Sequence, residues 1–428
     1  METRFTLDQL ADPDMRESEK ILRACVHCGF CTATCPTYVL LGDELDSPRG
    51  RIYLLKEMLE QDKPATQEVV THIDRCLSCL SCMSTCPSGV NYMHLVDHGR
   101  RHIEQTYQRP WRERILRRVL ARILPDPDVF RGLLRLASMI RPLRFAMPGR
   151  LAALAGMAPA RVPHQSSVDR PQVLPAQGPR RKRVALLSGC VQQVLAPRIN
   201  EATISLLQRH GCEVVVAEGV GCCSAVAHHL GQDVLDRVKA NTDAWLRVAD
   251  ADGLDAIVVN ASGCGTMLKD YGFLLRSDPA YAAKGQRISA LTKDVTELVS
   301  ELGLREVRIQ TGQRVAYQSP CSMQHGQQIK VQPKTLLTQA GFQVLDLPEA
   351  HLCCGSAGTY NILQPEIAAQ LGARKADCIS SVEPDLVASG NMGCMMQLAP
   401  RLAVPIVHTV ELLDWATGGD KPAALSTP

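Results

Sequence analysis

Several features that would assign a chain to a common class of protein are missing here. The net charge is only +3 over 428 residues, which is too small to indicate nucleic-acid binding by itself. No run approaches the ~18 uninterrupted apolar residues of a membrane-spanning helix, so we expect any membrane contact to be peripheral or through a partner. The opening residues, METRFTLDQL, lack the apolar core of a secretory leader.

Recognisable catalytic machinery is also missing from the sequence. No G-x-G-x-x-G motif follows a predicted strand and opens a helix, as a dinucleotide-binding turn requires. No Ser/His/Asp order and no pair of carboxylates stands out from the background. We therefore predict no catalytic residue in this chain.

Cysteine, by contrast, is abundant, with eighteen residues. In a long chain without a secretory leader, clustered cysteines indicate metal binding in a reducing compartment. Two runs share the spacing C-x2-C-x2-C-x3-C-P, which is typical of the ferredoxins that hold [4Fe–4S] clusters. The runs are Cys25, Cys28, Cys31 and Cys35 with Pro36, and Cys76, Cys79, Cys82 and Cys86 with Pro87.

The same spacing predicts which cysteines act together. Three close cysteines bind one cluster, and the fourth usually reaches the other cluster. The alternative is a pair of zinc sites, but these normally use two C-x2-C pairs separated by a longer loop. We therefore assign two [4Fe–4S] clusters, the first to Cys25, Cys28, Cys31 and Cys86, and the second to Cys76, Cys79, Cys82 and Cys35.

The segments around and after the cysteine runs are predicted to be helical. Pro48–Leu59 begins with proline in a favourable first turn and continues at helical spacing, so residues 1–108 should form an α-helical ferredoxin domain. Residues 109–158 form an arginine-rich helical segment, with eleven arginines and no lysine between Arg109 and Arg150. Such amphipathic helices either pack with a solvated basic face or dock onto lipid or a partner. A proline-rich linker, predicted to be extended, follows at 159–183.

The rest of the chain is an internal duplication. Each cysteine of a first set recurs 130 or 131 positions later, which marks two copies of one unit, residues 184–310 and 311–428. Each copy is predicted to be α/β, with its cysteines beyond the carboxyl ends of strands, where ligands collect in open sheets. These candidate ligands of a further metal or cluster are Cys190, Cys222, Cys223 and Cys264, and Cys321, Cys353, Cys354 and Cys394.

Three interpretations of the repeated cysteines remain open. They bind an additional iron–sulfur cluster, they bind zinc, or they pack as small buried apolar groups. Glycines beside every set favour a metal or cluster over simple packing. Four histidines are candidates to line these sites: His228, His229, His325 and His351.

The motifs together resemble a known family. CVHCGFCTATCPTY, the segment GDELDSPRGR and DRCLSCLSCMSTCPSGVNYMHLV are similar to the iron–sulfur subunits of glycolate oxidase (glycolate dehydrogenase). The repeated half resembles the paired cysteine-rich CCG domains of the heterodisulfide-reductase family. In that family each repeat ends in C-x2-C, whereas Ala261 and Asn391 replace the first cysteine here, which disfavours heterodisulfide chemistry.

The resemblance implies an iron–sulfur electron-transfer subunit of a membrane-associated complex. FAD-containing partner subunits would oxidise glycolate to glyoxylate, and electrons would pass through this chain towards quinone. The implied location is cytoplasmic and peripheral, on the inner face of the membrane, with no nucleic-acid partner. Alternatives are a glycerol-3-phosphate or lactate dehydrogenase subunit, or a heterodisulfide-reductase-like thiol–disulfide enzyme.

Overall fold

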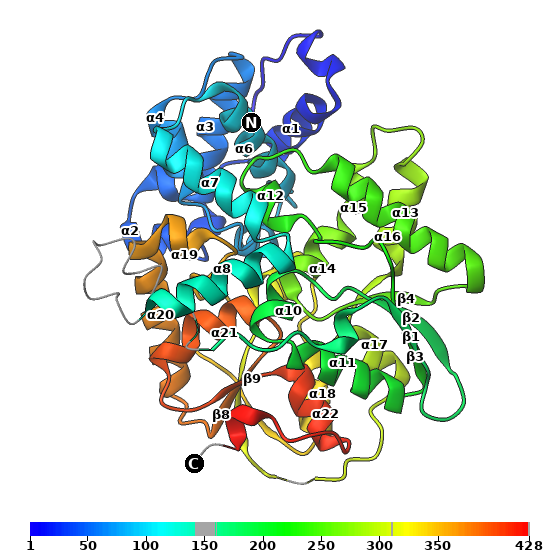
Figure 1. Cartoon of the computed structure of the whole chain (residues 1–428). Coiled ribbons are helices and arrows are strands. Elements are labelled where there is room, and N and C mark those ends of the chain that lie inside the picture. The colour runs from blue at the N-terminus through cyan, green and yellow to red at the C-terminus, as the bar shows by residue number, and fades with distance from the viewer. Residues whose placement is uncertain (142–158, 160, 310, 427–428) are drawn as a thin grey trace.

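The computed structural model describes residues 1–141, 159, 161–309 and 311–426. Figure 1 shows an N-terminal helical domain at the top, with two α/β repeats below it. No helix in these ranges is long and apolar enough to cross a membrane. The N-terminal domain contains α1 (Pro13–Ala24), α2 (Pro36–Leu41), α3 (Pro48–Glu60), α4 (Gln67–Asp74), α5 (Ser81–Thr85) and α6 (Tyr92–Thr106).

Local sequence sets the start of the helix between the two cysteine runs. The Ser47 side chain accepts a hydrogen bond from the backbone N–H of Gly50, and Pro48 occupies the first turn of α3. A Cβ atom at Gly50 would lie 2.1 Å from the carbonyl oxygen of Glu44. Glycine is therefore needed for the close approach of this helix to the preceding turn. The predicted α-helical ferredoxin domain is confirmed.

The arginine-rich segment forms two helices, α7 (Trp111–Ile123) and α8 (Pro127–Ile140). α8 contacts α10 (Val191–Leu195) of the first repeat, and α7 contacts α12 (Ala225–His229). The helical prediction is confirmed through residue 140. The remainder of the predicted segment, 142–158, lies outside the described residues.

The two repeats are open sheets with the same strand order. The first has the order β1-β3-β2-β4-β5 and the second β7-β6-β8-β9, so β3-β2-β4-β5 corresponds to β7-β6-β8-β9. All pairs are parallel except β1 with β3. The strands are β1 (Gln172–Leu174), β2 (Lys182–Leu186), β3 (Cys212–Val216), β4 (Ala256–Val259), β5 (Thr292–Asp294), β6 (Arg314–Gln318), β7 (Gln343–Leu345), β8 (Leu386–Ser389) and β9 (Ile406–His408).

The prediction of an extended linker at 159–183 is incomplete. Strand β1 lies inside it and pairs with β3, and β2 begins at its end, at Lys182. Strands β5 and β9, each at the outer edge of its sheet, were not predicted either.

Helices cover both sheets. The first repeat contains, besides α10 and α12, α11 (Arg198–Arg209), α13 (Leu235–Asp252), α14 (Ser262–Lys269), α15 (Tyr271–Leu274), α16 (Ala282–Leu291) and α17 (Val295–Leu302). The second contains the π-helical turn η6 (Ser322–Gly326), α18 (Gln332–Gln339), α19 (Tyr360–Leu363), α20 (Pro365–Ser380), α21 (Met392–Leu398) and α22 (Thr409–Ala416).

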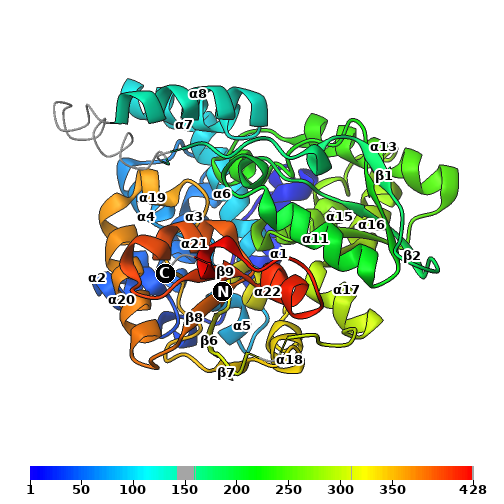
Figure 2. The ribbon, with the colours of Figure 1, turned by 60° about the horizontal axis from the view of Figure 1, so that its bottom comes forward.

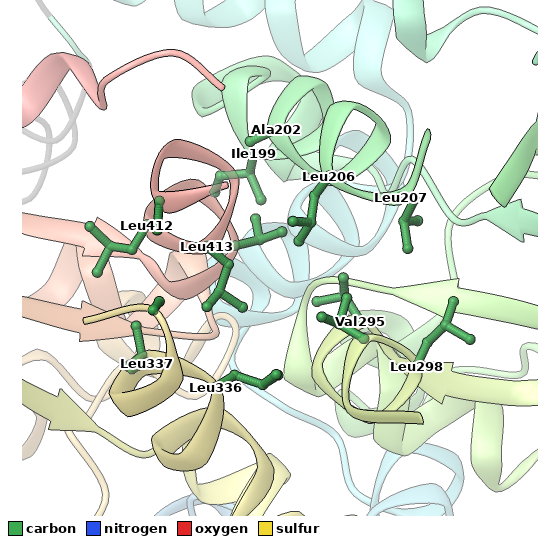
Figure 3. Close-up of a cluster of buried hydrophobic side chains, with 14 of the residues drawn as sticks. Ile199, Ala202, Leu206, Leu207, Val295, Leu298, Leu336, Leu337, Leu412 and Leu413 are labelled. Carbon is green, nitrogen blue, oxygen red and sulfur yellow. The ribbon is translucent and has the colours of Figure 1, made fainter. Parts of the chain in front are cut away.

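One hydrophobic cluster belongs to both repeats. Figure 3 shows side chains of α11 and α17 from the first repeat meeting those of α18 and α22 from the second. Leu206, Leu336 and Leu413 are all buried in this cluster. The two sheets are therefore held together by a continuous apolar core, and we expect the repeats to unfold as one unit.

Substitution of Leu413 tests this shared core. Leu413→Ala should lower the free energy of unfolding by about 2–5 kcal/mol, because it leaves a cavity in a packed interior. Urea unfolding followed by circular dichroism under anaerobic conditions should show one transition at a lower midpoint. Leu7→Ala is the matched control, since Leu7 is exposed. Two separate transitions in the parent chain would contradict a shared core.

Candidate functional site

The first cysteine run surrounds an open hollow of about 430 Å³. Cys25, Cys28 and Cys31 line it together with Cys82 and Cys86 from the second run. Burial raises the pKa of Cys25, and the nearby Cys86 and Cys28 raise it further. Cys28 is exposed, so this group lies at the surface of the domain.

The second group lies deeper in the domain. Cys76, Cys79 and Cys82 are buried, and so is Cys35 of the first run. Burial raises the pKa of Cys82 well above its ordinary value, and the neighbouring Cys76 and Cys35 act in the same direction. The structure thus places Cys35 with the second run and Cys86 with the first, in the crossed arrangement that the spacing predicts. Their ligation of iron stays a prediction.

The backbone of the two runs is alike at equivalent positions. The second and fourth residues after the first cysteine are left-handed in both runs: His27 and Gly29 in one, Ser78 and Leu80 in the other. Residues other than glycine adopt this conformation at a cost of roughly 1–3 kcal/mol each. Both loops therefore hold the same strained turn, which brings three thiols of each run to one side.

A buried ion-pair network supports the second group. The fully buried Arg51 lies 3.2 Å from the Asp46 carboxylate and donates to the carbonyl oxygen of His72 at 2.7 Å. Its guanidinium also donates to Cys35 Sγ at 3.8 Å. Arg75 donates to the other Asp46 oxygen at 2.8 Å. One side chain thus connects a cysteine of the first run with the helix that leads into the second.

Arg51 stays positively charged despite its burial. Burial by itself lowers the pKa of Arg51, but Cys76, Tyr92, Cys35 and Asp46 raise it above its ordinary value. A permanent positive charge therefore lies beside a group of thiols that becomes negative on deprotonation. The sequence alone did not predict this role of Arg51. The segment GDELDSPRGR, which contains Asp46 and Arg51, did stand out as one of the motifs that carry the family resemblance.

The same network explains a cluster of potential cation ligands. Among the described residues, one group of three His, Cys, Asp or Glu side chains has all its ligand atoms within 4.8 Å of one another. It consists of Asp43, Asp46 and His72. Both Asp46 oxygens already accept hydrogen bonds from Arg51 and Arg75. The cluster is therefore an ion-pair network rather than a cation site.

The four cysteines of the first repeat come together beyond its strands. Cys190 Sγ and Cys222 Sγ are 3.4 Å apart, and Cys223 is hydrogen-bonded to Cys222 and Cys264. Hydrogen bonds from Cys190 and Cys223 lower the pKa of the Cys222 thiol. The backbone N–H of Ser224 points at the same sulfur at 3.4 Å. The same hydrogen bonds, together with burial, raise the pKa values of Cys190 and Cys223.

The second repeat forms an equivalent group. Cys321 Sγ and Cys353 Sγ are 3.6 Å apart, and Cys354 is hydrogen-bonded to Cys353 and Cys394. At the position where the family has a further cysteine, the Asn391 side chain donates to Cys394 Sγ at 3.5 Å. The predicted convergence of each set is therefore seen in both repeats.

The second repeat also contacts the ferredoxin domain through its cysteines. Cys79 and Cys353 belong to one buried cluster, against which Cys321 packs. Tyr360 Oη donates to the carbonyl oxygen of Arg75 at 2.9 Å, and Ser84 lies 2.7 Å from Nδ1 of His325. The second group of the ferredoxin domain and the second-repeat group are therefore neighbours.

The candidate histidines do not pair with the repeat thiols. His228 and His229 contact the Asp97 carboxylate at 3.4 and 3.3 Å. His325 bridges Ser84 and the carbonyl oxygen of His351. These side chains hold the repeats against the N-terminal domain, and within the described contacts none reaches a cysteine sulfur.

The spacing of the sulfurs bears on the choice of metal. Tetrahedral zinc with bonds of about 2.3 Å to sulfur draws its four thiolates to roughly 3.8 Å from one another. In the described part of the chain, no three cysteine sulfurs all lie within 4.8 Å of one another. In each repeat, however, one pair of sulfurs lies at 3.4 or 3.6 Å, closer than the thiolates of a zinc site or of a cluster, so both interpretations stay open.

Comparison with protein families identifies the same parts. Residues 21–90 match a 4Fe-4S dicluster domain, and residues 184–269 and 315–399 match the Cysteine-rich domain. The crystal structure of a hypothetical protein from Helicobacter pylori aligns with a TM-score of 0.55 at 11% identity, over 96% of this chain and 74% of that one, which shows a shared fold.

Similar sequences span nearly the whole chain. The glycolate oxidase iron-sulfur subunit of Escherichia coli K12 is 41% identical over 97% of this chain and 99% of its own length. A probable glycolate oxidase iron-sulfur subunit of Bacillus subtilis 168 is 30% identical over 94% of this chain and 96% of its own length. Lactate utilization protein A of Bacillus subtilis 168 is 29% identical and matches 54% of this chain and 99% of its own length.

The Arg51 network leads to a testable expectation. Arg51→Met should lower the free energy of unfolding by about 3–5 kcal/mol, because it leaves the buried Asp46 with one guanidinium fewer. It should also lower the reduction potential of a cluster bound at Cys35, since a nearby positive charge favours the more negative, reduced state. Potentiometric titration followed by EPR measures this shift. Arg287→Met, at a surface ion pair, should leave both quantities unchanged; an unaltered potential in Arg51→Met would contradict the electrostatic role.

Proposed function

The chain belongs to the family of glycolate oxidase iron–sulfur subunits, and from this premise we propose that it relays electrons from FAD-containing partner subunits towards quinone. The partners oxidise glycolate to glyoxylate in this proposal. The observation that carries it is the single buried cluster that contains both Cys79 of the ferredoxin domain and Cys353 of the second repeat. Two groups of metal-binding thiols in one buried cluster form a path rather than isolated structural sites.

The cysteines of the ferredoxin domain fit the two [4Fe–4S] clusters that the spacing predicts. Each ferredoxin site offers four free thiols, and those of the first line an open hollow. When bound, [4Fe–4S] clusters supply one-electron oxidation and reduction. Cys25, Cys28, Cys31 and Cys86 would hold the first, and Cys76, Cys79, Cys82 and Cys35 the second.

The exposure of the groups supports an order along the path. The first group reaches the surface at Cys28, beside the exposed apolar side chains of Val26 and Phe30. The second group of cysteines is buried. It lies between the first group and the second repeat. We propose that the flavoprotein docks near Val26 and Phe30, and that electrons then pass inward through the second group to the repeat.

At least one repeat is proposed to bind a further iron–sulfur cluster. The second repeat is the better placed, because its cysteines adjoin Cys79. The first repeat, with a thiolate favoured at Cys222, is the second candidate.

Substrate and location follow from the relatives and stay part of the proposal. Glycolate is favoured over lactate because the lactate-utilisation relative matches only 54% of this chain. Heterodisulfide cleavage is disfavoured by Ala261 and Asn391 at the positions of the missing cysteines. The chain is proposed to work in the cytoplasm, peripherally on the inner face of the membrane.

Metal content tests the number of sites. Anaerobically purified chain should contain about twelve irons, four for each of three cubes, with a matching content of acid-labile sulfide. Cys353→Ala should remove the iron of the second repeat and its EPR signal while the two ferredoxin signals remain. A content of about eight irons, unchanged by Cys353→Ala, would exclude a cluster in the second repeat.

The relay itself is tested in the assembled complex. Cys79→Ala should abolish glycolate-dependent reduction of a quinone analogue, while the flavoprotein still oxidises glycolate with a direct flavin acceptor. Cys378→Ala is the matched control, because this half-buried thiol lies outside the four groups and contacts Glu349. Undiminished electron flux to quinone in Cys79→Ala would refute the relay.

A further inference from the structure

Helices α7 and α8 turn charged side chains towards the protein. Arg109 and Arg117 are both buried, and each donates to the Asp74 carboxylate, at 2.6 and 2.7 Å. Both also bond to Glu113. On α8, the buried Arg131 donates to the carbonyl oxygens of Pro163 and Gln193. These arginines anchor the helix pair to the body of the molecule.

The outward side of the same helices is apolar. Of sixteen large apolar side chains exposed among the described residues, seven lie on α7 and α8, with exposed fractions between 41% and 76%. They follow helical spacing, so each helix presents one continuous stripe. We name this surface the apolar face: Trp111, Ile115, Val119, Val129, Leu133, Leu136 and Met139.

This orientation reverses that of an ordinary surface hairpin. A soluble helix normally buries its apolar stripe and exposes its charges, and contiguous exposed apolar patches mark interaction sites. Figure 2 shows α7 and α8 along the top edge of the molecule, with no other described element over them. Of the arginines on α7, only Arg117 is buried, so a solvated basic face is present as well, beside the exposed apolar one.

The apolar face has a positively charged surround. Five arginines of these helices are exposed, and none of them forms an ion pair within the described part of the chain. The one acid on α7, Glu113 in its first turn, is occupied by the buried Arg109 and Arg117. The exposed arginines are Arg112, Arg114, Arg118, Arg122 and Arg135.

We propose that the apolar face rests in the interfacial layer of a bilayer that contains anionic lipid. Its aliphatic side chains and Trp111 lie at the acyl boundary, and the exposed arginines contact phosphate groups. This inference rests on the proposed function only in that it brings the chain to the membrane where a quinone is dissolved.

The chemistry of the face favours lipid over a protein partner. Protein interfaces carry roughly one hydrogen bond per 100–200 Å², which requires varied donors and acceptors. The face offers guanidinium groups and hydrocarbon. The only hydroxyl on the two helices, Ser138, is already bonded to the carbonyl oxygens of Leu134 and Pro159. A surface of one charge sign with a hydrocarbon centre matches anionic headgroups above acyl chains.

Vesicle binding by the full, cluster-loaded chain tests the proposal. The parent should float with phosphatidylglycerol-containing vesicles and much less with pure phosphatidylcholine vesicles, and added salt should weaken binding. The double variant Leu136→Ser and Met139→Ser should bind about a hundredfold more weakly, since each buried apolar side chain accounts for roughly tenfold. The double variant Arg118→Gln and Arg122→Gln should lose about fivefold per arginine on anionic vesicles alone.

Controls separate this surface from the rest of the molecule. Leu7→Ser with Met396→Ser removes two exposed apolar side chains elsewhere and should leave vesicle binding unchanged. Circular dichroism and iron content of all variants should equal those of the parent. Equal binding by the parent and the Leu136/Met139 variant would overturn the proposal, and so would loss of flavoprotein association by that variant with vesicle binding intact.

A second readout keeps this proposal distinct from the proposed function. In the assembled complex, the Leu136/Met139 variant should still reduce a water-soluble acceptor with glycolate but not a quinone held in vesicles. If the parent complex itself fails to reduce either acceptor, the relay is refuted while vesicle binding of the chain remains a valid test of the apolar face.

Discussion

The buried ion pair of Asp46 with Arg51 is the interaction on which the cysteine sites depend. Neither side chain has access to water, so each needs the other to offset its desolvation. Through Arg51 the network reaches Cys35 and the carbonyl oxygen of His72. It thereby joins the first cysteine run to the helix before the second run, which the crossed grouping of cysteines requires.

From that domain, packing continues into the repeats. Cys79 lies in a cluster with Cys353, and Tyr360 bonds to the carbonyl oxygen of Arg75 beside the ion-pair network. The two repeats in turn share a core, so the thiol sites are fixed relative to one another. A relay needs such rigidity, because electron transfer depends on short distances that do not change.

On α7 and α8, several large apolar side chains face outward, although the apolar stripe of an amphipathic helix is normally buried. Asp74 on α4 offers a carboxylate to Arg109, just before α7, and to Arg117 on it, and these two ion pairs fix which side of α7 faces the domain. The apolar side is then left outside. An amphipathic pattern specifies that a helix has two faces, but the partner at hand decides which face is buried.

The sequence by itself determined the thiol chemistry, the helical character of the cluster domain and the duplication, because ligand spacing, helix caps and repeat offsets are local or strictly periodic. It also contained the segment with Asp46 and Arg51, but not what that pair contacts. Only the tertiary structure decided that Cys79 adjoins Cys353, that three-residue strands complete each sheet, and that the apolar face points outward. These features join residues far apart in the chain, and their energies come from burial and charge pairing that exist only once the elements have packed together.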